Sequence, residues 1–462
     1  MKKTIVIFTA LILIFISSCD PNSQDKLMKI GNCWITTEQF DDFTPRYTYK
    51  FLSPSEKDKK INDFIDRQLI IHDAIKNRYL KNSEILTELK NARTRSLIGY
   101  YFDKHITDSL ITKDMLLTTY ESLDLTKREL FTFDEYKPLI KEQLVNQHNQ
   151  EMEAAYYKIV DRLKSDNNIY AISSNIDSLS RKYTEIFRDL YSKTKETPTP
   201  RVVLKTINYG KHVYSMNNEQ YSFSDFLKAL EDYPYSIPNR LSDPVFFGNI
   251  IENIILNDYI RKTALKNKYY NEPDFKLRML LKRNTILHKY YMEKEIKSKI
   301  INDRDSLHTY YQLNKDSLYT TERLYEVHEI FIENKALAEQ VLNLAIYSEN
   351  YKKLSDKFTE RYKSRPKKGY LGFITEDKYS SIGKTAAITK VGQVYPELLK
   401  SGDGYSIVKV LSVKEPEVLP FDKISDRVWS DYYRYKFSVL RKELLSKLKD
   451  KYTYNIDVSK LN

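Results

Sequence analysis

The segment AIKNRYL, residues 74–80, returns as ALKNKYY at residues 264–270. The segment IGYYFDKHI at 98–106 likewise returns as HKYYMEKEI at 288–296, at the same offset of 190 residues. Apolar residues spaced by three and four run through these stretches, which predicts amphipathic helices. Because a fixed offset without gaps is the signature of internal repetition, the sequence predicts a duplicated helical unit.

A later pair of segments repeats at a different spacing. FDEYKPLI at 133–140 can be laid over FDKISDRV at 421–428, at an offset of 288. The second copy therefore contains about 98 residues that the first lacks, which is the size of a small domain. Between 321 and 413 the pattern changes from helical to mixed, and RLYEVHEIFIE at 323–333 reads as a strand. We expect an inserted α+β domain with the order β-α-α-β-α-β-β.

The predicted fold is mostly α with one α+β domain. Two helical units are expected, the second of which carries the inserted domain. The expected divisions are a signal peptide at 1–18, a tether at 19–26, a first helical unit at 27–170, a connecting helix and linker at 171–200, the N-terminal part of the second unit at 201–321, the inserted domain at 322–414, and a closing helix and strand at 415–462.

Three local expectations follow from residue types. Thr36 or Thr37 is expected to cap a helix that runs through Gln39 and Phe43. RVVLKTINYG, at 201–210, reads as a strand that opens the second unit. Of paired tyrosines such as Tyr100 and Tyr101, no more than one should face the core, because adjacent helical residues diverge by about 100°.

The N-terminus predicts export. Two lysines precede an apolar run at 4–16 that is too short to span a bilayer, as in a signal peptide. The residues ISSC that end this region resemble the lipobox of bacterial lipoproteins, which implies that Cys19 becomes a lipidated N-terminus. An ordinary signal peptide with a chance cysteine is the alternative. Cys33 is the second of two cysteines, so no disulfide framework is expected.

Composition limits the classes of partner. Neither HExxH nor CxxC occurs, and the seven histidines are scattered, so no metal and no cofactor are expected. The net charge of +12 would suit anionic lipid headgroups or acidic clients. Basic residues alternate with acidic ones as on solvated helix faces, and an exported protein rarely meets nucleic acid, so no nucleic-acid partner is expected.

Four collinear pieces of the inserted domain resemble the parvulin family of peptidyl-prolyl isomerases. VHEIFIE is similar to the family's opening strand with its histidine, KKGYLGFI to its GGDLGFF loop, KVGQV to its LKVGEV turn, and GYSIVKVL to its closing GYHIIKVL. The flanking helical unit, which closes with LPFDKISDRV, resembles the chaperone part of the SurA, PrsA and PpiD group. The first unit resembles the same framework without a parvulin domain.

This resemblance implies a site in the inserted domain. His328 corresponds to the first family histidine and Ser406 to the second, so the histidine pair is broken. Arg361 falls near the family's cysteine or aspartate. The resemblance implies substrate contacts from Arg361 and from residues of the proline pocket and its loop, which are Lys378, Ile382, Leu371 and Phe373. His328 either keeps a role in the site or is a plain strand histidine.

The resemblance also implies a function. We expect an extracytoplasmic folding factor, anchored by lipid on the periplasmic side of a bacterial membrane, whose partners are unfolded or nascent exported polypeptides. Its parvulin domain would have weak or lost isomerase activity. An active peptidyl-prolyl isomerase is the alternative, and a scaffold lipoprotein that handles no clients is a third reading. The sequence does not assign the oligomeric state.

Overall fold

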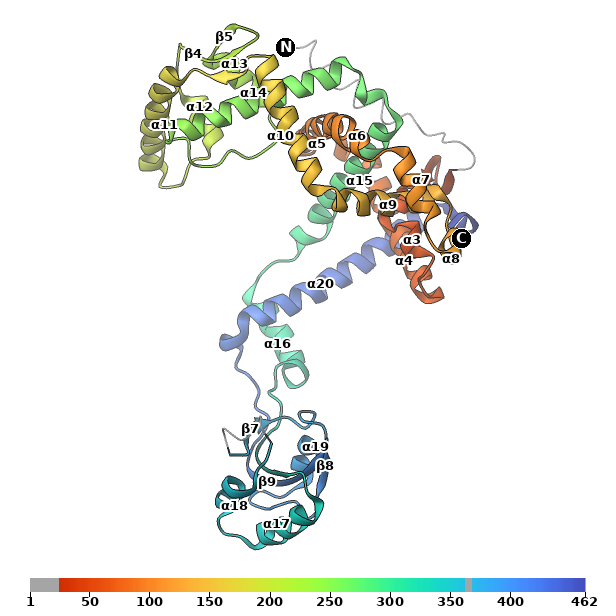
Figure 1. The fold of residues 1–462 in the computed structure, drawn as a ribbon, viewed down its shortest axis with the longest axis vertical. Coiled ribbons are helices and arrows are strands. Elements are labelled where there is room, and N and C mark those ends of the chain that lie inside the picture. Colours follow the sequence, from red (N-terminus) through yellow and green to blue (C-terminus); the bar gives the residue numbers. More distant parts are fainter. Residues whose placement is uncertain (1–24, 362–367, 462) are drawn as a thin grey trace. The chain divides into compact units, whose positions relative to one another are not determined.

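The computed structural model describes residues 25–361 and 368–461. The predicted signal peptide, Cys19 and most of the predicted tether lie outside the described residues. The chain forms two compact units, one comprising the described residues up to Lys299 together with those from Leu440 onward, and the other comprising Ile300–Val439. The predicted fold class is confirmed, since long helices dominate and a small mixed domain interrupts them (Figure 1).

Helices make up most of the first unit. They are α2 (Thr37–Phe43), α3 (Arg46–Tyr49), α4 (Pro54–Lys76), η1 (Tyr79–Lys81), α5 (Ser83–Phe102), η2 (Asp103–Thr107), α6 (Asp108–Leu110), α7 (Lys113–Glu121), α8 (Leu125–Leu130), α9 (Phe133–Gln147), α10 (Asn149–Asp166), α11 (Ser173–Thr194), α12 (Pro200–Thr206), α13 (Phe223–Asp232), α14 (Pro244–Lys266), η3 (Tyr269–Asn271), α15 (Pro273–Glu295) and η4 (Lys297–Lys299). The helix α20 (Phe421–Lys451) begins in the second unit and ends in the first, followed by η6 (Val458–Leu461).

Two small sheets of the first unit are each completed by a distant strand. The hairpin of β1 (Lys26–Ile30) and β2 (Cys33–Thr36) pairs with β10 (Tyr454–Ile456), in the order β10-β1-β2. The hairpin of β4 (His212–Met216) and β5 (Glu219–Ser222) pairs with β3 (Tyr170–Ala171), in the order β3-β4-β5. The first hairpin is thus completed by β10, which follows α20 near the C-terminal end of the described chain. The second hairpin is completed by β3, which follows α10.

The segments 190 residues apart fold alike. Helices α4 and α14 each contain 23 residues and carry proline in the first turn, where proline costs no hydrogen bond. Each is followed, two residues beyond its last helical residue, by a left-handed residue, Arg78 or Lys268, both with a φ of 58°. Helices α4 and α5 pack on α15, and α5 also packs on α14, so the two segments share one core instead of forming separate bodies.

Each hairpin leads into a helix whose N-cap is a hydroxyl residue. Thr36 is the N-cap of α2, and its backbone N–H donates to Oε1 of Gln39 at 3.1 Å. Ser222 caps α13 and exchanges hydrogen bonds with Asp225. The structure therefore assigns the predicted first cap to Thr36 and finds an equivalent cap at the second hairpin.

Two local predictions were wrong. Residues 201–210 do not form a strand, because Pro200 starts α12 and the burial of Val203 and Leu204 on one side favours a helix over β-propensity. Tyr100 and Tyr101 are both buried. Helix α5 lies between two hydrophobic clusters, and Tyr100 packs in one of them while Tyr101 packs in the other. Two faces of the helix are therefore buried.

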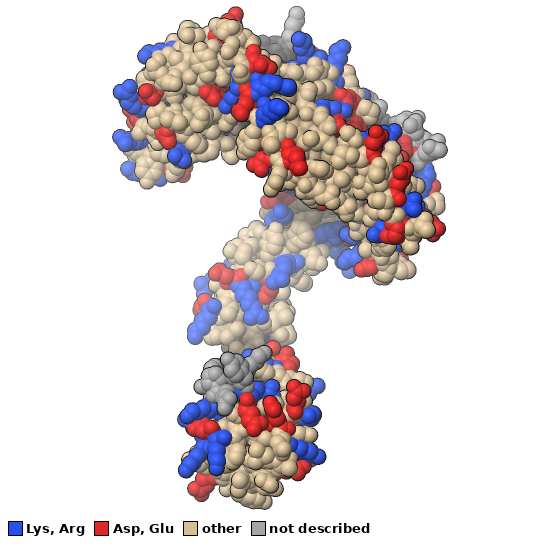
Figure 2. All heavy atoms as spheres, viewed as in Figure 1, with Lys and Arg blue, Asp and Glu red and all other residues tan. Residues whose placement is uncertain are grey.

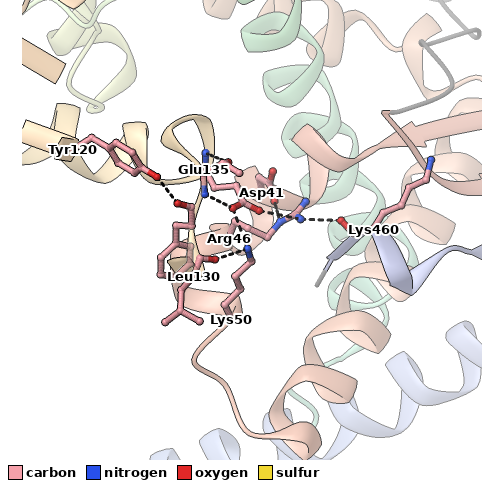
Figure 3. Close-up of polar contacts among 9 residues, drawn as sticks. Asp41, Arg46, Lys50, Tyr120, Leu130, Glu135 and Lys460 are labelled. Atoms are coloured by element: carbon pink, nitrogen blue, oxygen red, sulfur yellow. Dashed lines mark hydrogen bonds and ion pairs between the residues drawn. The ribbon is translucent and has the colours of Figure 1, made fainter. Parts of the chain in front are cut away.

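A buried arginine holds the start of the chain to its end (Figure 3). Nε of Arg46 donates to Asp41 at 2.9 Å, and one guanidinium nitrogen donates to the backbone carbonyl of Lys460 at 2.8 Å. Lys50 pairs with Glu135 of α9 at 3.0 Å. These contacts join α3 both to α9 and to the C-terminal turn.

Asp73 of α4 is a second buried anchor. Its carboxylate accepts hydrogen bonds from Lys451 at 2.7 Å, Tyr452 at 2.6 Å, Tyr291 at 2.5 Å and Asn77 at 2.6 Å. Burial alone would raise the pKa of Asp73, but the hydrogen bonds from Lys451, Tyr291 and Tyr452 hold its pKa below the usual 3.8. The carboxylate therefore ties α4 to α15 and to the end of α20.

The second unit contains one four-stranded antiparallel sheet in the order β7-β6-β9-β8. Its strands are β6 (Leu324–Ile332), β7 (Tyr370–Ile374), β8 (Leu399–Ser401) and β9 (Gly404–Lys414), and its helices are α16 (Arg304–Leu318), α17 (Lys335–Tyr347), α18 (Tyr351–Phe358), α19 (Ser381–Ile388) and the first part of α20. Strand β6 lies in the centre, paired on one side with β7 and on the other with β9. In the part of the chain that the structure describes, no helix combines the length and apolarity needed to cross a membrane.

We predict that Asp73→Ala lowers the free energy of unfolding of the first unit by about 3 kcal/mol, because Lys451 and two tyrosines lose their acceptor. The contribution has a definite pH dependence. Since the folded pKa is depressed, the stabilisation is present above the unfolded value of about 3.8 and is lost as pH falls through the lower folded value. Urea unfolding midpoints of the wild type and Asp73→Asn between neutral and acidic pH test this, and equal slopes for both proteins would contradict it.

Candidate functional site

The sheet of the second unit has two differently covered faces. Ile330 and Ile332 of β6 pack with α17 and α18 in one cluster. Val408 and Val410 of β9 pack with α19 in another cluster on the opposite face. Because successive strand residues point to opposite faces, Glu329 and Phe331 lie on the α19 side, whereas His328 lies on the side of α17 and α18.

Three polar side chains meet on the α19 side. Oγ of Ser406 donates to Oε1 of Glu329 at 2.6 Å, and a guanidinium nitrogen of Arg361 lies 3.1 Å from the same oxygen. Glu329 is 1% exposed and Ser406 is fully buried. The pairing follows from the register, since Phe331 is opposite Ser406 and Glu329 is two positions along on the same face.

Arg361 closes this cluster. Its guanidinium lies over the ring of Phe331, 4.1 Å from the centroid, and donates to Oγ of Ser401 at 2.7 Å. The side chain is one-third exposed, so it is the part of the cluster that solvent reaches. A buried carboxylate is costly unless it is paired, and Arg361 supplies the compensating charge.

His328 does not meet Ser406. Its Nε2 is 2.7 Å from the carbonyl oxygen of Lys368, and its ring contacts Tyr351 on the other face of the sheet. The two positions that correspond to the family histidines are thus separated by β6 itself, and Glu329 takes the place facing Ser406. The expectation that His328 and Ser406 share one site is wrong, because strand alternation puts neighbouring residues on opposite faces.

Tyr351 fills the space beneath His328. Its hydroxyl donates to the carbonyl of Ile407 at 2.8 Å and lies 3.3 Å from that of His328. Burial raises the pKa of Tyr351 well above 10, so it stays a neutral donor. These contacts are those of a satisfied core, which favours the reading of His328 as a strand histidine.

The remaining predicted residues are not gathered in one place. Leu371 packs in the α19 cluster, and Ile382 of α19 is buried in that cluster at 3% exposure. Phe373 is in register with Glu326 and lies under the ammonium of Lys414. Lys378 is exposed in the turn before α19. Of the predicted substrate contacts, Arg361 is the one that touches the Glu329 cluster.

Gly369 shows why β7 can lie close to the cluster. Its φ is +79°, and a Cβ atom there would lie 1.9 Å from the carbonyl oxygen of Glu329. The backbone N–H of Glu329 donates to the carbonyl of Gly369 at 2.8 Å. Only glycine permits both the dihedral angle and the approach.

The chemistry open to this cluster is non-covalent. The Ser406 hydroxyl is buried and donates to a carboxylate that Arg361 already pairs, and within the described residues no histidine is hydrogen-bonded to it as a base. Within the described residues, no group of three or more histidine, cysteine, aspartate or glutamate side chains is arranged to hold a metal ion. The exposed guanidinium can donate hydrogen bonds to a carbonyl oxygen of a bound chain.

Comparison with known proteins identifies the second unit. Residues 303–426 match the family model described as the PPIC-type PPIASE domain. The predicted parvulin-type domain is therefore confirmed for that part of the chain. A tRNA(Met) cytidine acetate ligase from Clostridium novyi (strain NT) is 26% identical over 170 residues, which are 34% of this chain and 38% of that protein. The chain thus spans well under half of the length of this relative.

Solved structures of folding proteins are also similar. One chain from Campylobacter jejuni, of the PEB4 and Cj1289 pair described as SurA-like chaperones, is 16% identical with a TM-score of 0.38, covering 54% of this chain and 100% of that chain. PrsA from Bacillus anthracis is 18% identical with a TM-score of 0.20, covering 41% and 80%. PrsA from Bacillus subtilis is 21% identical with a TM-score of 0.18, covering 49% and 80%.

Glu329 is the site residue that sequence reasoning missed. A signal for it was present, because a carboxylate inside the apolar run VHEIFI alternates onto the same face as Phe331. What the sequence lacks is the register of β6 against β9, which brings Glu329 to Ser406. The sequence therefore indicates which face of the strand Glu329 occupies but does not indicate that Ser406 is its partner.

We predict that Glu329→Ala destabilises the parvulin-type domain by about 3 kcal/mol, because it leaves Arg361 and Ser406 without their acceptor, whereas Ser406→Ala costs about 1 kcal/mol. Hydrogen-exchange mass spectrometry of β6 and β9 measures this locally. Ser412→Ala is the control, since Ser412 bonds to the more exposed Glu326 of the same strand. Unchanged protection in Glu329→Ala would show that the cluster does not hold the two strands together.

Proposed function

We propose that this protein is an extracytoplasmic folding factor that holds unfolded polypeptides, and that its parvulin-type domain has weak or absent isomerase activity. The observation that carries the proposal is the match of residues 303–426 to the PPIC-type domain together with the Glu329, Ser406 and Arg361 cluster inside that domain. The match indicates the class of protein, and the cluster indicates what its site can do.

The reduced activity follows from the barrier. Rotation about an X-Pro bond faces a barrier of about 20 kcal/mol, and catalysis requires polar groups that bind the twisted amide more tightly than the planar one. In this domain, Glu329 and Arg361 already neutralise each other, and the Ser406 hydroxyl is committed to the carboxylate. Fewer polar groups are therefore free to surround a twisted amide.

Exposed aromatic side chains support client binding by the helical unit. Phe51, Tyr157 and Tyr191 are 66%, 57% and 48% exposed. Tyrosine combines a large apolar surface with a polar tip, which suits broad contact of low specificity with unfolded chains. Such exposure also favours client handling over the scaffold reading, which requires no exposed apolar surface.

The charge distribution supports polypeptide clients over nucleic acid. Acidic and basic side chains are interspersed over the face that Figure 2 shows, without a broad area of one sign. A nucleic-acid partner would favour basic residues gathered into a stripe or patch. We therefore include no nucleic-acid partner in the proposal.

A working prolyl isomerase is the second candidate, and the family match favours it. It requires the exposed guanidinium of Arg361 to hold the substrate carbonyl while the proline ring packs nearby. The two candidates agree on the client, an unfolded chain, and differ in whether the bound X-Pro bond turns over faster.

We predict that the purified full-length protein suppresses aggregation of a chemically unfolded model protein at equimolar ratio, while an X-Pro peptide isomerises at its uncatalysed rate, over about 10–100 s at 25 °C. Light scattering and a protease-coupled peptide assay, run side by side, measure the two activities. Unchecked aggregation would remove the folding-factor proposal. Accelerated isomerisation that is lost in Arg361→Leu but kept in His328→Ala would establish the second candidate instead.

The proposed location rests on Cys19 as a lipid-bearing N-terminus. A single lipid chain binds membranes only marginally, so anchoring would come from the multiple chains of a lipoprotein. We predict that the wild-type protein sediments with membranes after cell lysis and that Cys19→Ala moves it to the soluble fraction. Equal sedimentation of both would contradict a lipid anchor.

A further inference from the structure

A polar cavity of about 200 Å³ lies in the first unit, lined by residues of α2, α4 and α15. Three side-chain amides line it, together with two charged and two apolar side chains. These residues are Gln39, Gln68, Asn284, Asp42, Arg67, Phe43 and Leu281. The cavity does not belong to the parvulin-type domain, and nothing in the fold so far requires it.

The three amides of this cavity belong to largely buried side chains whose N–H₂ groups donate no hydrogen bond within the described residues. Gln68 and Asn284 are each 5% exposed. Among the described residues, the Gln68 amide makes no hydrogen bond, and Asn284 uses only its Oδ1, which accepts from Arg283 at 3.1 Å. Gln39 likewise uses only its Oε1, which accepts from Thr36. Among the described residues, the side-chain atoms that are sealed from solvent without a hydrogen-bond partner include none of these amide atoms, so solvent reaches the N–H₂ groups through the cavity. They are donors that an acceptor entering the cavity can use.

The equivalent place in the other segment is closed. The offset of 190 residues relates residues that line this cavity to residues that line a second site. Phe43 corresponds to Tyr233, Gln68 to Asp258, and Asn284 to Thr94. At the second site, Arg261 pairs with Asp232 at 2.9 Å and with Asp258 at 2.6 Å, and no space for a water remains.

One residue accounts for much of this difference. The position of Arg261 in the second site is occupied in the first by Ile71, which supplies no charge. The same helical frame therefore has an internal ion-pair network at one site and an open cavity with spare donors at the other. This contrast shows that the frame does not itself require the cavity.

We propose that the cavity binds one peptide unit of an extended, unfolded chain, through its carbonyl oxygen. The donors are the amides of Gln68, Asn284 and Gln39 with the Arg67 guanidinium, and Oε1 of Gln68 and the Asp42 carboxylate accept the peptide N–H. Phe43 supplies an apolar wall for the adjoining side chain. Such a site reads the backbone and so accepts any sequence, which is what a holder of unfolded chains needs. The inference rests on the proposed function and adds a binding site for the polypeptide client.

The test removes the hydrogen-bonding groups while keeping the volume. In Gln68→Leu with Asn284→Leu, affinity for a fluorescein-labelled unstructured peptide of alanine, serine and glycine should fall about tenfold, the effect of two lost hydrogen bonds. Fluorescence anisotropy of the full-length protein measures it. Thr94→Val, at the closed site, is the matched control and should bind as the wild type does.

A second measurement covers the case in which the double variant folds poorly. A benzoylphenylalanine photocrosslinker is placed at Phe43 in the open cavity, or at Tyr233 in the closed site. Crosslinking of the labelled peptide from position 43 and not from position 233 supports the proposal. Equal yields overturn it, as does unchanged affinity of a folded double variant. If the wild type suppresses aggregation but the cavity proposal fails these tests, the folding-factor proposal stands and the cavity proposal falls. If the wild type does not suppress aggregation, both proposals fall.

Discussion

The pairing of β10 with β1 is the contact on which the first unit depends. It places Ile456 opposite Met28 and Tyr454 opposite Ile30, which joins the two ends of the described chain. A two-stranded hairpin is marginal in water, and the third strand makes the first sheet stable. The long loop that this contact closes costs entropy that grows only slowly with length, so a whole domain can be carried between α15 and the end of α20. Asp73 and Arg46 then secure the same junction with buried polar contacts.

The second hairpin is completed in the complementary way, by β3 from the segment before it. Each hairpin thus takes its third strand from the other segment, and the helices α4, α5, α14 and α15 pack between them. This exchange makes the two segments one cooperative body, because neither sheet is complete without residues from both. The physical result is one helical frame with a small domain inserted into its sequence.

The same physical rule explains the polar clusters of the helical frame and of the parvulin-type domain. A buried charge must be paired, and the pairing decides whether a site can bind anything else. In the parvulin-type domain, Arg361 and Ser406 satisfy Glu329, which leaves little to act on a twisted amide. At the closed site of the frame, Arg261 satisfies Asp232 and Asp258, whereas the equivalent cavity near Gln68 keeps its donors. The two proposals on function therefore place client binding in the frame and not in the proline site.

Local chemistry was readable from the sequence by itself. Helix periodicity, a threonine cap at 36 or 37 and the order of strands and helices in the parvulin-type domain depend on residues close together in the chain, and each matched the structure. The tertiary structure alone decided which strand completes which hairpin, that Tyr100 and Tyr101 are both interior, and that Glu329 and not His328 meets Ser406. These outcomes depend on register and on packing from two sides. Both are set by residues distant in the chain, which a pattern along one segment does not contain.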